Sequence, residues 1–89
     1  MAWTLEFKKK ALDQLESLDQ KVAHRVVTFL ETRVITSEKP WELGTKLQGK
    51  EFEGLIRFRV GDYRILTEVK NEKLIVLVVG VGHRGEVYR

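Results

Sequence analysis

The sequence predicts a small α+β domain in which an N-terminal strand and a two-helix hairpin precede an antiparallel three-stranded meander (β-α-α-β-β-β). Three observations give this order. Apolar and polar residues alternate near the N-terminus, apolar residues recur every three or four positions between 11 and 30, and strand-like alternation returns after position 52. A length of 89 residues suits one domain, residues 1–89, with one small core.

The first half of the chain is expected to form a strand and two helices. Trp3–Phe7 alternates as a short strand does. Asp19 is a good N-cap for the second helix, which we expect to fray near Val34–Ile35, where β-branched residues accumulate. The apolar stripe of the first helix consists of Ala11, Leu12, Leu15 and Leu18, and that of the second consists of Val22, Val26, Phe29 and Leu30.

A linker-like segment, Ser37–Gly44, separates the helices from the second half. Pro40 excludes an unbroken helix through this segment, because proline lacks the backbone N–H that a helix interior needs. Trp41 and Leu43 are the large apolar residues of the segment. We expect them to anchor the loop to the core.

The second half is predicted to be a meander of three strands, roughly Phe52–Val60, Tyr63–Lys70 and Lys73–Val81, with a turn near Asn71–Glu72. The run Leu74–Val79 is apolar on both faces, which is typical of a strand covered on both sides. Two helices can cover only one face of so small a sheet. Loops around Trp41, a second copy of the chain or a separate partner could cover the other face, and the pattern leaves these open.

The turn between the first two meander strands predicts an unusual cluster of arginines. Gly61-Asp62 is a two-residue hairpin signal, because glycine takes the positive φ of a type II′ turn. Val60 would then pair with Tyr63 and Arg59 with Arg64, while Arg57 would lie diagonally across from Arg64. Like charges in direct opposition destabilise a sheet unless an anion lies between them. We therefore expect this face to bind phosphate.

Charge and composition favour a nucleic acid or an acidic protein as partner. Seven basic and seven acidic residues precede Gly44, whereas nine basic and six acidic residues follow from it onward, so the net charge of +3 belongs to the half with the arginines. The absence of cysteine, of a signal peptide and of an apolar run long enough for a membrane indicates a cytosolic protein. His24 and His83 are far apart and lack an acidic cluster, so we expect no metal and no cofactor.

The residue types of the second half suit RNA cleavage. Guanidinium groups contact phosphate oxygens and stabilise the charge that develops on a phosphorane. The base that deprotonates the ribose 2′-OH could be His83, since imidazole titrates near neutral pH, or Tyr88, if arginines lower its pKa. Alternatively, each arginine is a solvated strand residue or a surface ion-pair partner. The cluster, which is close together if the chain after Gly82 turns back along the sheet, consists of Arg57, Arg59, Arg64, His83, Arg84 and Tyr88.

Four segments resemble the RelE/ParE superfamily of bacterial and archaeal toxins. They are Lys46-Leu-Gln-Gly49, Arg57-Phe-Arg59, Gly61-Asp-Tyr-Arg-Ile65 and Val81-Gly-His-Arg-Gly-Glu-Val-Tyr88. The resemblance covers nearly the whole chain and implies the microbial RNase-like RelE fold. For the RelE branch it implies a ribosome-dependent mRNA endoribonuclease acting in the A site. For the ParE branch it implies a DNA gyrase inhibitor without nuclease activity.

The resemblance also implies roles for individual residues. Arg64 matches the arginine that stabilises the scissile phosphate, Arg84 the proposed general acid, and Tyr88 the tyrosine that stacks on the substrate base and helps to activate the 2′-OH. Leu55 stands where the RelE branch has a lysine, so one basic group is missing. Tyr88 nevertheless favours the RelE branch. The remaining expected phosphate or RNA contacts are Arg57, Arg59, Lys46 and Lys50, with His83 as a catalytic candidate.

The partners that the resemblance implies are a cognate antitoxin, the ribosome with its mRNA, and operator DNA bound through the antitoxin complex. No membrane partner is expected. We therefore expect a type II toxin that inhibits translation by cleaving mRNA. The alternatives are a gyrase inhibitor whose arginines form a protein interface, and an inactive member that acts only in a DNA-binding autorepressor complex.

Overall fold

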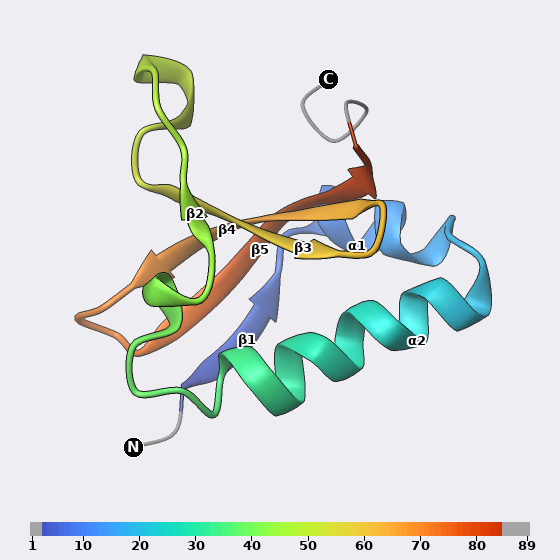
Figure 1. Ribbon diagram of the computed structural model, residues 1–89, viewed down its shortest axis with the longest axis horizontal. Helices are drawn as coiled ribbons and strands as arrows, with labels where there is room; N and C mark the ends of the chain where they lie inside the picture. Colours follow the sequence, from blue (N-terminus) through green and yellow to red (C-terminus); the bar gives the residue numbers. More distant parts are fainter. Residues whose placement is uncertain (1–2, 85–89) are drawn as a thin grey trace.

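The computed structural model describes residues 3–84 and confirms the α+β class (Figure 1). The sheet has five strands rather than the four expected, because a short strand forms after the linker. A π-helical turn (Leu30–Val34) and 3₁₀ turns at Pro40–Glu42 and Lys50–Phe52 complete the chain. The main elements are β1 (Thr4–Phe7), α1 (Lys9–Glu16), α2 (Gln20–Phe29), β2 (Thr45–Lys46), β3 (Leu55–Val60), β4 (Tyr63–Lys70) and β5 (Ile75–His83).

The strand order is β1-β5-β4-β3-β2. The predicted meander of β3, β4 and β5 is confirmed, with antiparallel pairing throughout. The N-terminal strand β1 adds to the far side of β5 in parallel, with Leu5 opposite Val76 and Phe7 opposite Val78. This addition places β5 between β1 and β4. A central position explains why β5 is the most apolar strand of the chain.

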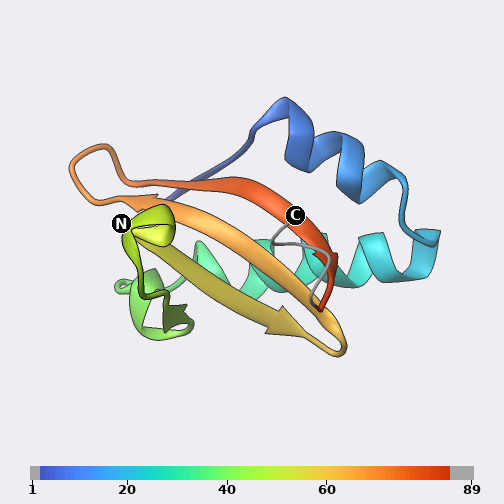
Figure 2. The same ribbon diagram turned by 90° about the horizontal axis from the view of Figure 1, so that it is seen from above.

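Both helices pack on one face of the sheet, as two perpendicular views show (Figures 1 and 2). Phe58 of β3 is 1% exposed and meets Phe29 of α2 edge to face, with ring centroids 6.1 Å apart. In α1, Ala11 and Leu15 are buried as predicted, but Leu12 is 43% exposed, so its expected place in the apolar stripe is wrong. Among residues 3–84, no helix is long and apolar enough to cross a membrane.

Helix α2 begins as predicted and ends differently. The Asp19 carboxylate accepts a hydrogen bond from the Lys21 N–H at 3.2 Å, which confirms the N-cap. The helical segment ends near Val34 as expected, but it ends in a regular wider turn and does not fray. The backbone widens into the π-helical turn, in which the Ile35 N–H donates to the Leu30 carbonyl at 3.0 Å. Val34 is fully buried, so burial outweighs the weak helix propensity of its β-branched side chain.

The linker is anchored by Pro40, which was not predicted, and in part by Trp41, which was. Pro40 is buried at the start of its 3₁₀ turn, whereas Leu43 is 51% exposed and does not anchor the loop. Trp41 rests edge-on against Trp3, with ring centroids 6.1 Å apart, yet is 37% exposed. The chain then rises on the side of the sheet away from the helices as an arm, residues 45–54, which contains β2 (Figure 1).

Candidate functional site

The hairpin between β3 and β4 has the predicted register. Gly61 and Asp62 are the two turn residues, and Gly61 has the positive φ, 59°, that the sequence indicated. Val60 lies opposite Tyr63, and Arg59 lies directly opposite Arg64. This tight turn fixes the relative position of the arginines, because its register determines which side chains share a face.

Three arginines lie on the face of the sheet away from the helices. We call this the open face; its residues on β3 and β4 are Leu55, Arg57, Arg59, Arg64, Leu66, Glu68 and Lys70. Arg57 lies opposite Leu66, and is therefore diagonal to Arg64, as predicted. The hairpin thus places three positive charges on one side of a two-stranded ribbon. An arrangement of this kind is suited to a polyanion.

The Arg64 side chain is held against the hairpin turn. Its Nη1 donates to the carbonyl oxygens of Gly61 and Tyr63, each at 3.2 Å. These bonds use one nitrogen of the guanidinium and restrict its orientation. The other donors remain available for a bidentate contact with a phosphate.

Two glycines of β5 lie on the open face beside the arginines. Gly82 lies opposite Arg64 and Gly80 opposite Leu66, so both occupy open-face positions on the neighbouring strand. Gly80 is buried and Gly82 is partly buried. The side chains of β4 therefore dominate this part of the open face.

The backbone of Arg84 is hydrogen-bonded to the same Gly61–Asp62 turn, from the end of β5. It follows the last residue of β5, and its backbone N–H donates to the Asp62 carbonyl at 2.9 Å. Its side chain is exposed. The structure therefore brings Arg84 to the hairpin that carries Arg59 and Arg64, although these residues are distant in sequence.

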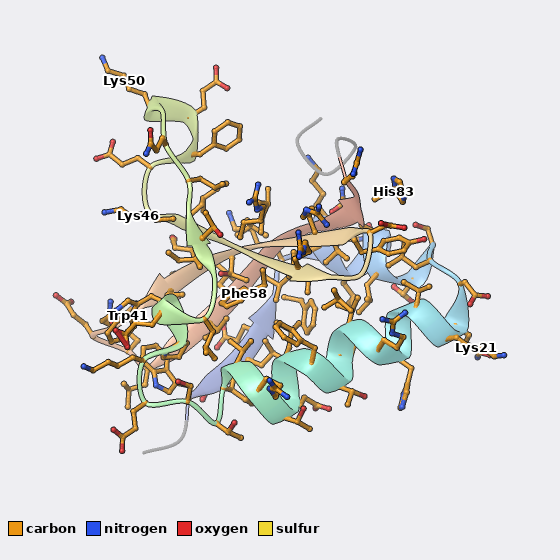
Figure 3. The ribbon with its side chains drawn as sticks, viewed as in Figure 1. Lys21, Trp41, Lys46, Lys50, Phe58 and His83 are labelled. Atoms are coloured by element: carbon orange, nitrogen blue, oxygen red, sulfur yellow. The ribbon has the colours of Figure 1, made fainter. Side chains whose placement is uncertain are left out.

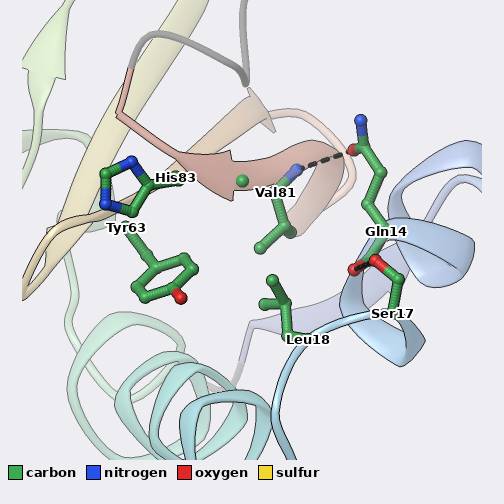
Figure 4. A pocket seen from close by; sticks show the side chains of 7 residues that line it. Gln14, Ser17, Leu18, Tyr63, Val81 and His83 are labelled. Atoms are coloured by element: carbon green, nitrogen blue, oxygen red, sulfur yellow. Dashed lines mark hydrogen bonds between the residues drawn. The ribbon is translucent and has the colours of Figure 1, made fainter.

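His83 does not join the arginines. It pairs with Tyr63, which lies on the same face of β4 as the buried Ile65 and therefore on the helix side of the sheet. The rings of His83 and Tyr63 meet edge to face, with centroids 5.4 Å apart. The expected grouping of His83 with the open-face arginines is thus wrong. His83 instead lines a cavity of about 280 Å³ with Gln14, Ser17, Leu18, Tyr63, Val81 and Gly82 (Figure 4).

The two lysines predicted to contact RNA lie on the arm. In β2, Thr45 is opposite Arg57, whereas Lys46 is opposite Ile56 and so is one position out of phase with the open-face arginines. Lys50 is exposed at the far end of the arm (Figure 3). The structure therefore does not bring either lysine into the arginine cluster.

Two further predictions meet different outcomes. Leu55 lies on the open face opposite Glu68, so a side chain without charge indeed stands at one corner of the arginine surface. Tyr88 lies outside the described residues, as does everything beyond Arg84. Within residues 3–84 there is no group of three or more histidine, cysteine or acidic side chains that could hold a metal ion.

One basic residue near the turn was missed from the sequence. Arg25 of α2 rests against Gly61 from the helix side: a Cβ atom placed on Gly61 would lie 3.6 Å from Arg25 Nη2. The available signal was the absence of any acidic residue between Asp19 and Glu31. That composition is unusual for a surface helix and indicates a face with unopposed positive charge.

Comparison with known proteins identifies the family to which this fold belongs. Residues 5–88 match the family model described as the ParE toxin of the type II toxin–antitoxin system parDE. The chain belongs to the RelE/ParE family of toxins. Toxin RelG of Mycobacterium tuberculosis is 30% identical over 89 residues, covering 100% of this chain and 99% of RelG. The mRNA interferase toxin RelE of Escherichia coli is 33% identical, covering 99% of this chain and 92% of RelE.

Solved structures of RelE/ParE toxins share the fold. The toxin–antitoxin complex RelBE2 of M. tuberculosis matches with a TM-score of 0.85 and 26% identity, covering 94% of this chain and 100% of that one. An arginine-to-alanine double mutant of E. coli RelE in the free state matches with a TM-score of 0.77 and 28% identity, covering 99% and 92%. The RelE-like fold expected from the sequence is thereby confirmed.

Proposed function

We propose that this RelE/ParE toxin is a ribosome-dependent endoribonuclease that cleaves mRNA within the A-site codon and so inhibits translation in the cytoplasm. The observation that carries the proposal is the arginine hairpin, in which Arg59 directly opposes Arg64 and Arg84 is tied to the same turn. A further support is the E. coli relative, which is named an mRNA interferase.

The cleavage begins with attack of the ribose 2′-oxygen on the adjacent phosphorus. As the O–P bond forms, negative charge spreads over the phosphoryl oxygens, and the bond to the 5′-oxygen then breaks. Arg64 contacts the scissile phosphate, a role supported by the orientation that two carbonyl oxygens already give its side chain. Arg57 and Arg59 contact neighbouring phosphates of the bound strand.

The proton transfers are assigned to residues near the end of the chain. The family resemblance assigns Arg84 as the general acid toward the departing 5′-oxygen, and the bond from its backbone N–H to the Asp62 carbonyl holds it near the arginine hairpin. Tyr88 stacks on the substrate base and, in its deprotonated form, accepts the proton of the 2′-OH. We do not assign the base to His83, because its ring packs on Tyr63 and lines the helix-side cavity.

The test is cleavage mapping of a defined mRNA on programmed ribosomes with wild-type toxin, Arg84→Ala and Tyr88→Phe. Wild-type toxin should cut within the A-site codon, and Arg84→Ala should cut much more slowly. A strong loss in Tyr88→Phe would assign the chemistry to the hydroxyl rather than to the ring. Intact mRNA on functional ribosomes would reject the nuclease.

A second candidate, inhibition of DNA gyrase, is favoured by two observations. The matching family model bears the ParE description, and Leu55 removes a basic group from the open face. In this alternative the arginines bind a protein surface. Expression would then cause double-strand DNA breaks while mRNA stays intact, and purified toxin would inhibit supercoiling by gyrase.

We propose that an antitoxin neutralises the toxin by covering the open face. Relatives are solved as RelBE complexes, including one from Pyrococcus horikoshii with a TM-score of 0.69 and 27% identity. On this chain, carboxylates of the antitoxin would pair with Arg57, Arg59 and Arg64, and apolar residues would pack beside Leu66. Operator DNA would bind the resulting complex mainly through the antitoxin.

A further inference from the structure

The Gly61–Asp62 turn is contacted by arginines from both sides of the sheet. On the open-face hairpin, Arg64 Nη1 donates to the Gly61 carbonyl at 3.2 Å. On the helix side, the Arg25 guanidinium rests against Gly61, with Nη2 and Nη1 at 3.6 Å and 4.0 Å from a Cβ placed there. Arg64 and Arg25 therefore bring positive charge to the turn from the open face and from α2, on either side of the exposed Asp62 carboxylate.

The exposed side of α2 extends this charge. Lys21 and Arg25 are four residues apart, so they lie on one stripe of the helix, and His24 is exposed beside them. No acidic residue occurs between Asp19 and Glu31. Within residues 3–84, neither Lys21 nor Arg25 forms an ion pair, in contrast to Lys9 of α1, which pairs with Asp13 at 3.0 Å.

Two shallow depressions adjoin Arg25 and offer neutral polar groups. One, of about 530 Å³, is lined by Gln20, Lys21, His24 and Arg25. The other, of about 280 Å³, is lined by His24, Arg25, Thr28, Phe29, Thr32 and Val60, and so joins α2 to the end of β3. Hydroxyl and imidazole groups between cations are typical partners of a sugar–phosphate backbone.

We propose that Lys21 and Arg25, with His24 between them, form a second RNA-binding surface that contacts backbone phosphates outside the cleavage site. This surface rests on the proposed function, because that function places RNA on the adjoining open face. One RNA can then contact both faces by passing around the hairpin turn. An acidic protein segment would be the alternative occupant of the same charges.

The inference is tested by the affinity of the full-length toxin for a fluorescein-labelled RNA hairpin, measured by anisotropy across a salt series. The test variant is Lys21→Gln/Arg25→Gln. Arg33→Gln is the matched control, because Arg33 is exposed on the π-helical turn beyond α2 and away from the hairpin turn. Circular dichroism of each variant checks whether it is folded.

The double variant should bind the RNA on the order of tenfold more weakly near physiological salt, and its salt slope should fall by about two, one for each lost phosphate contact. Arg33→Gln should bind as the wild type does. Equal affinity in all three proteins would overturn the inference, as would an absence of RNA binding by the wild type. The inference would also be overturned if the double substitution weakened binding of polyglutamate but did not weaken binding of RNA.

The ribosome cleavage assay separates this inference from the proposed function. If both hold, the double variant should raise the ribosome concentration needed for half-maximal cleavage and leave the saturated rate unchanged, because it weakens binding away from the reacting atoms. If wild-type toxin does not cleave mRNA but the double variant still loses RNA affinity, the nuclease is rejected and the second surface remains. If cleavage occurs and affinity is unchanged, only the second surface is rejected.

Discussion

At the scale of single residues, the open face combines charges that do not favour folding. Arg59 and Arg64 stand directly opposite each other on neighbouring strands. Cross-strand pairs of like charge destabilise a sheet, whereas pairs of opposite charge or of β-branched residues stabilise it. The arginines that we propose to bind a polyanion should therefore lower the stability of the free toxin.

Replacement of Arg59 tests this directly. Arg59→Thr should raise the free energy of unfolding by about 0.2–1 kcal/mol at low ionic strength, because it removes the repulsion and introduces a residue suited to strands. Urea denaturation of the free toxin measures the effect. Arg59→Lys is the matched control, since it keeps the charge and should leave stability near that of the wild type.

The same comparison of unfolding free energies at high salt tests whether the effect of Arg59 is electrostatic. At about 1 M NaCl the Debye length is roughly 3 Å, so the repulsion between exposed arginines is screened. The part of the gain that is due to charge should then disappear. A gain that is equal at low and high salt would show that Arg59 does not oppose folding through its charge.

At the scale of elements, the position of Arg84 depends on the hydrogen bonds that hold the end of β5. β1 pairs with β5 only as far as Val78, and the Lys8 N–H donates to the Val78 carbonyl at 2.9 Å. Beyond that point Gln14 of α1 takes over: its Oε1 accepts the Val81 N–H at 2.9 Å (Figure 4). One side chain thus satisfies the strand edge just before Gly82 and Arg84.

Gln14→Ala should lower the free energy of unfolding by about 1–2 kcal/mol, because the Val81 N–H loses its acceptor in a partly buried place. Thermal or urea denaturation measures the change. Gln14→Glu is the matched control, because it keeps an oxygen that can accept the bond. If the alanine and glutamate variants were equally stable, the hydrogen bond would have no role in holding β5.

A second element-scale prediction concerns the close approach of the linker to β3. A Cβ on Gly44 would lie 2.6 Å from both the Arg57 carbonyl oxygen and Ile56 Cγ2. Since the first of these is a backbone atom, Gly44→Ala must displace the linker or the strand. We expect a loss of about 1–3 kcal/mol in unfolding free energy. The exposed Thr45→Ala should change it little, and an equal loss in both variants would contradict the steric explanation.

At the scale of the whole molecule, locally encoded features were predicted and long-range ones were not. The Gly61–Asp62 turn fixes its own register, so the pairing of Arg59 with Arg64 could be derived from the sequence. The parallel pairing of β1 with β5 joins segments from the two ends of the chain. Because these segments are distant in sequence, no local sequence pattern predicts their pairing. The two-residue strand β2 is too short to give an alternation signal.

The face of His83 could not be derived for a related reason. A register shift between Leu66 and Thr67 pairs Leu66 with Gly80 but Thr67 with Val78, which leaves Val79 as an extra residue of β5. Such a bulge changes the face to which later residues point. Arg64 and Arg84 meet at one turn as predicted, whereas His83, which was expected close to them, lies on the helix side of the sheet.

The resulting molecule has two faces with different tasks. The helix side buries the core around Phe58, Leu30 and Ile65, and the open face carries the arginines. Substitution of an open-face arginine should therefore leave the packing of the core intact. The central claim is that the arginines of the open face stabilise a cleavage transition state on the ribosome.

The single-turnover rate of mRNA cleavage on programmed ribosomes, compared among the wild type, Arg64→Ala and Arg33→Ala at saturating ribosome, tests this claim most directly. We predict cuts in the A-site codon, slowed about 10²–10³-fold in Arg64→Ala through loss of one preorganised charge, and unchanged in Arg33→Ala. Arg64→Ala cleaving at the wild-type rate, or wild-type toxin leaving the mRNA intact, would contradict it.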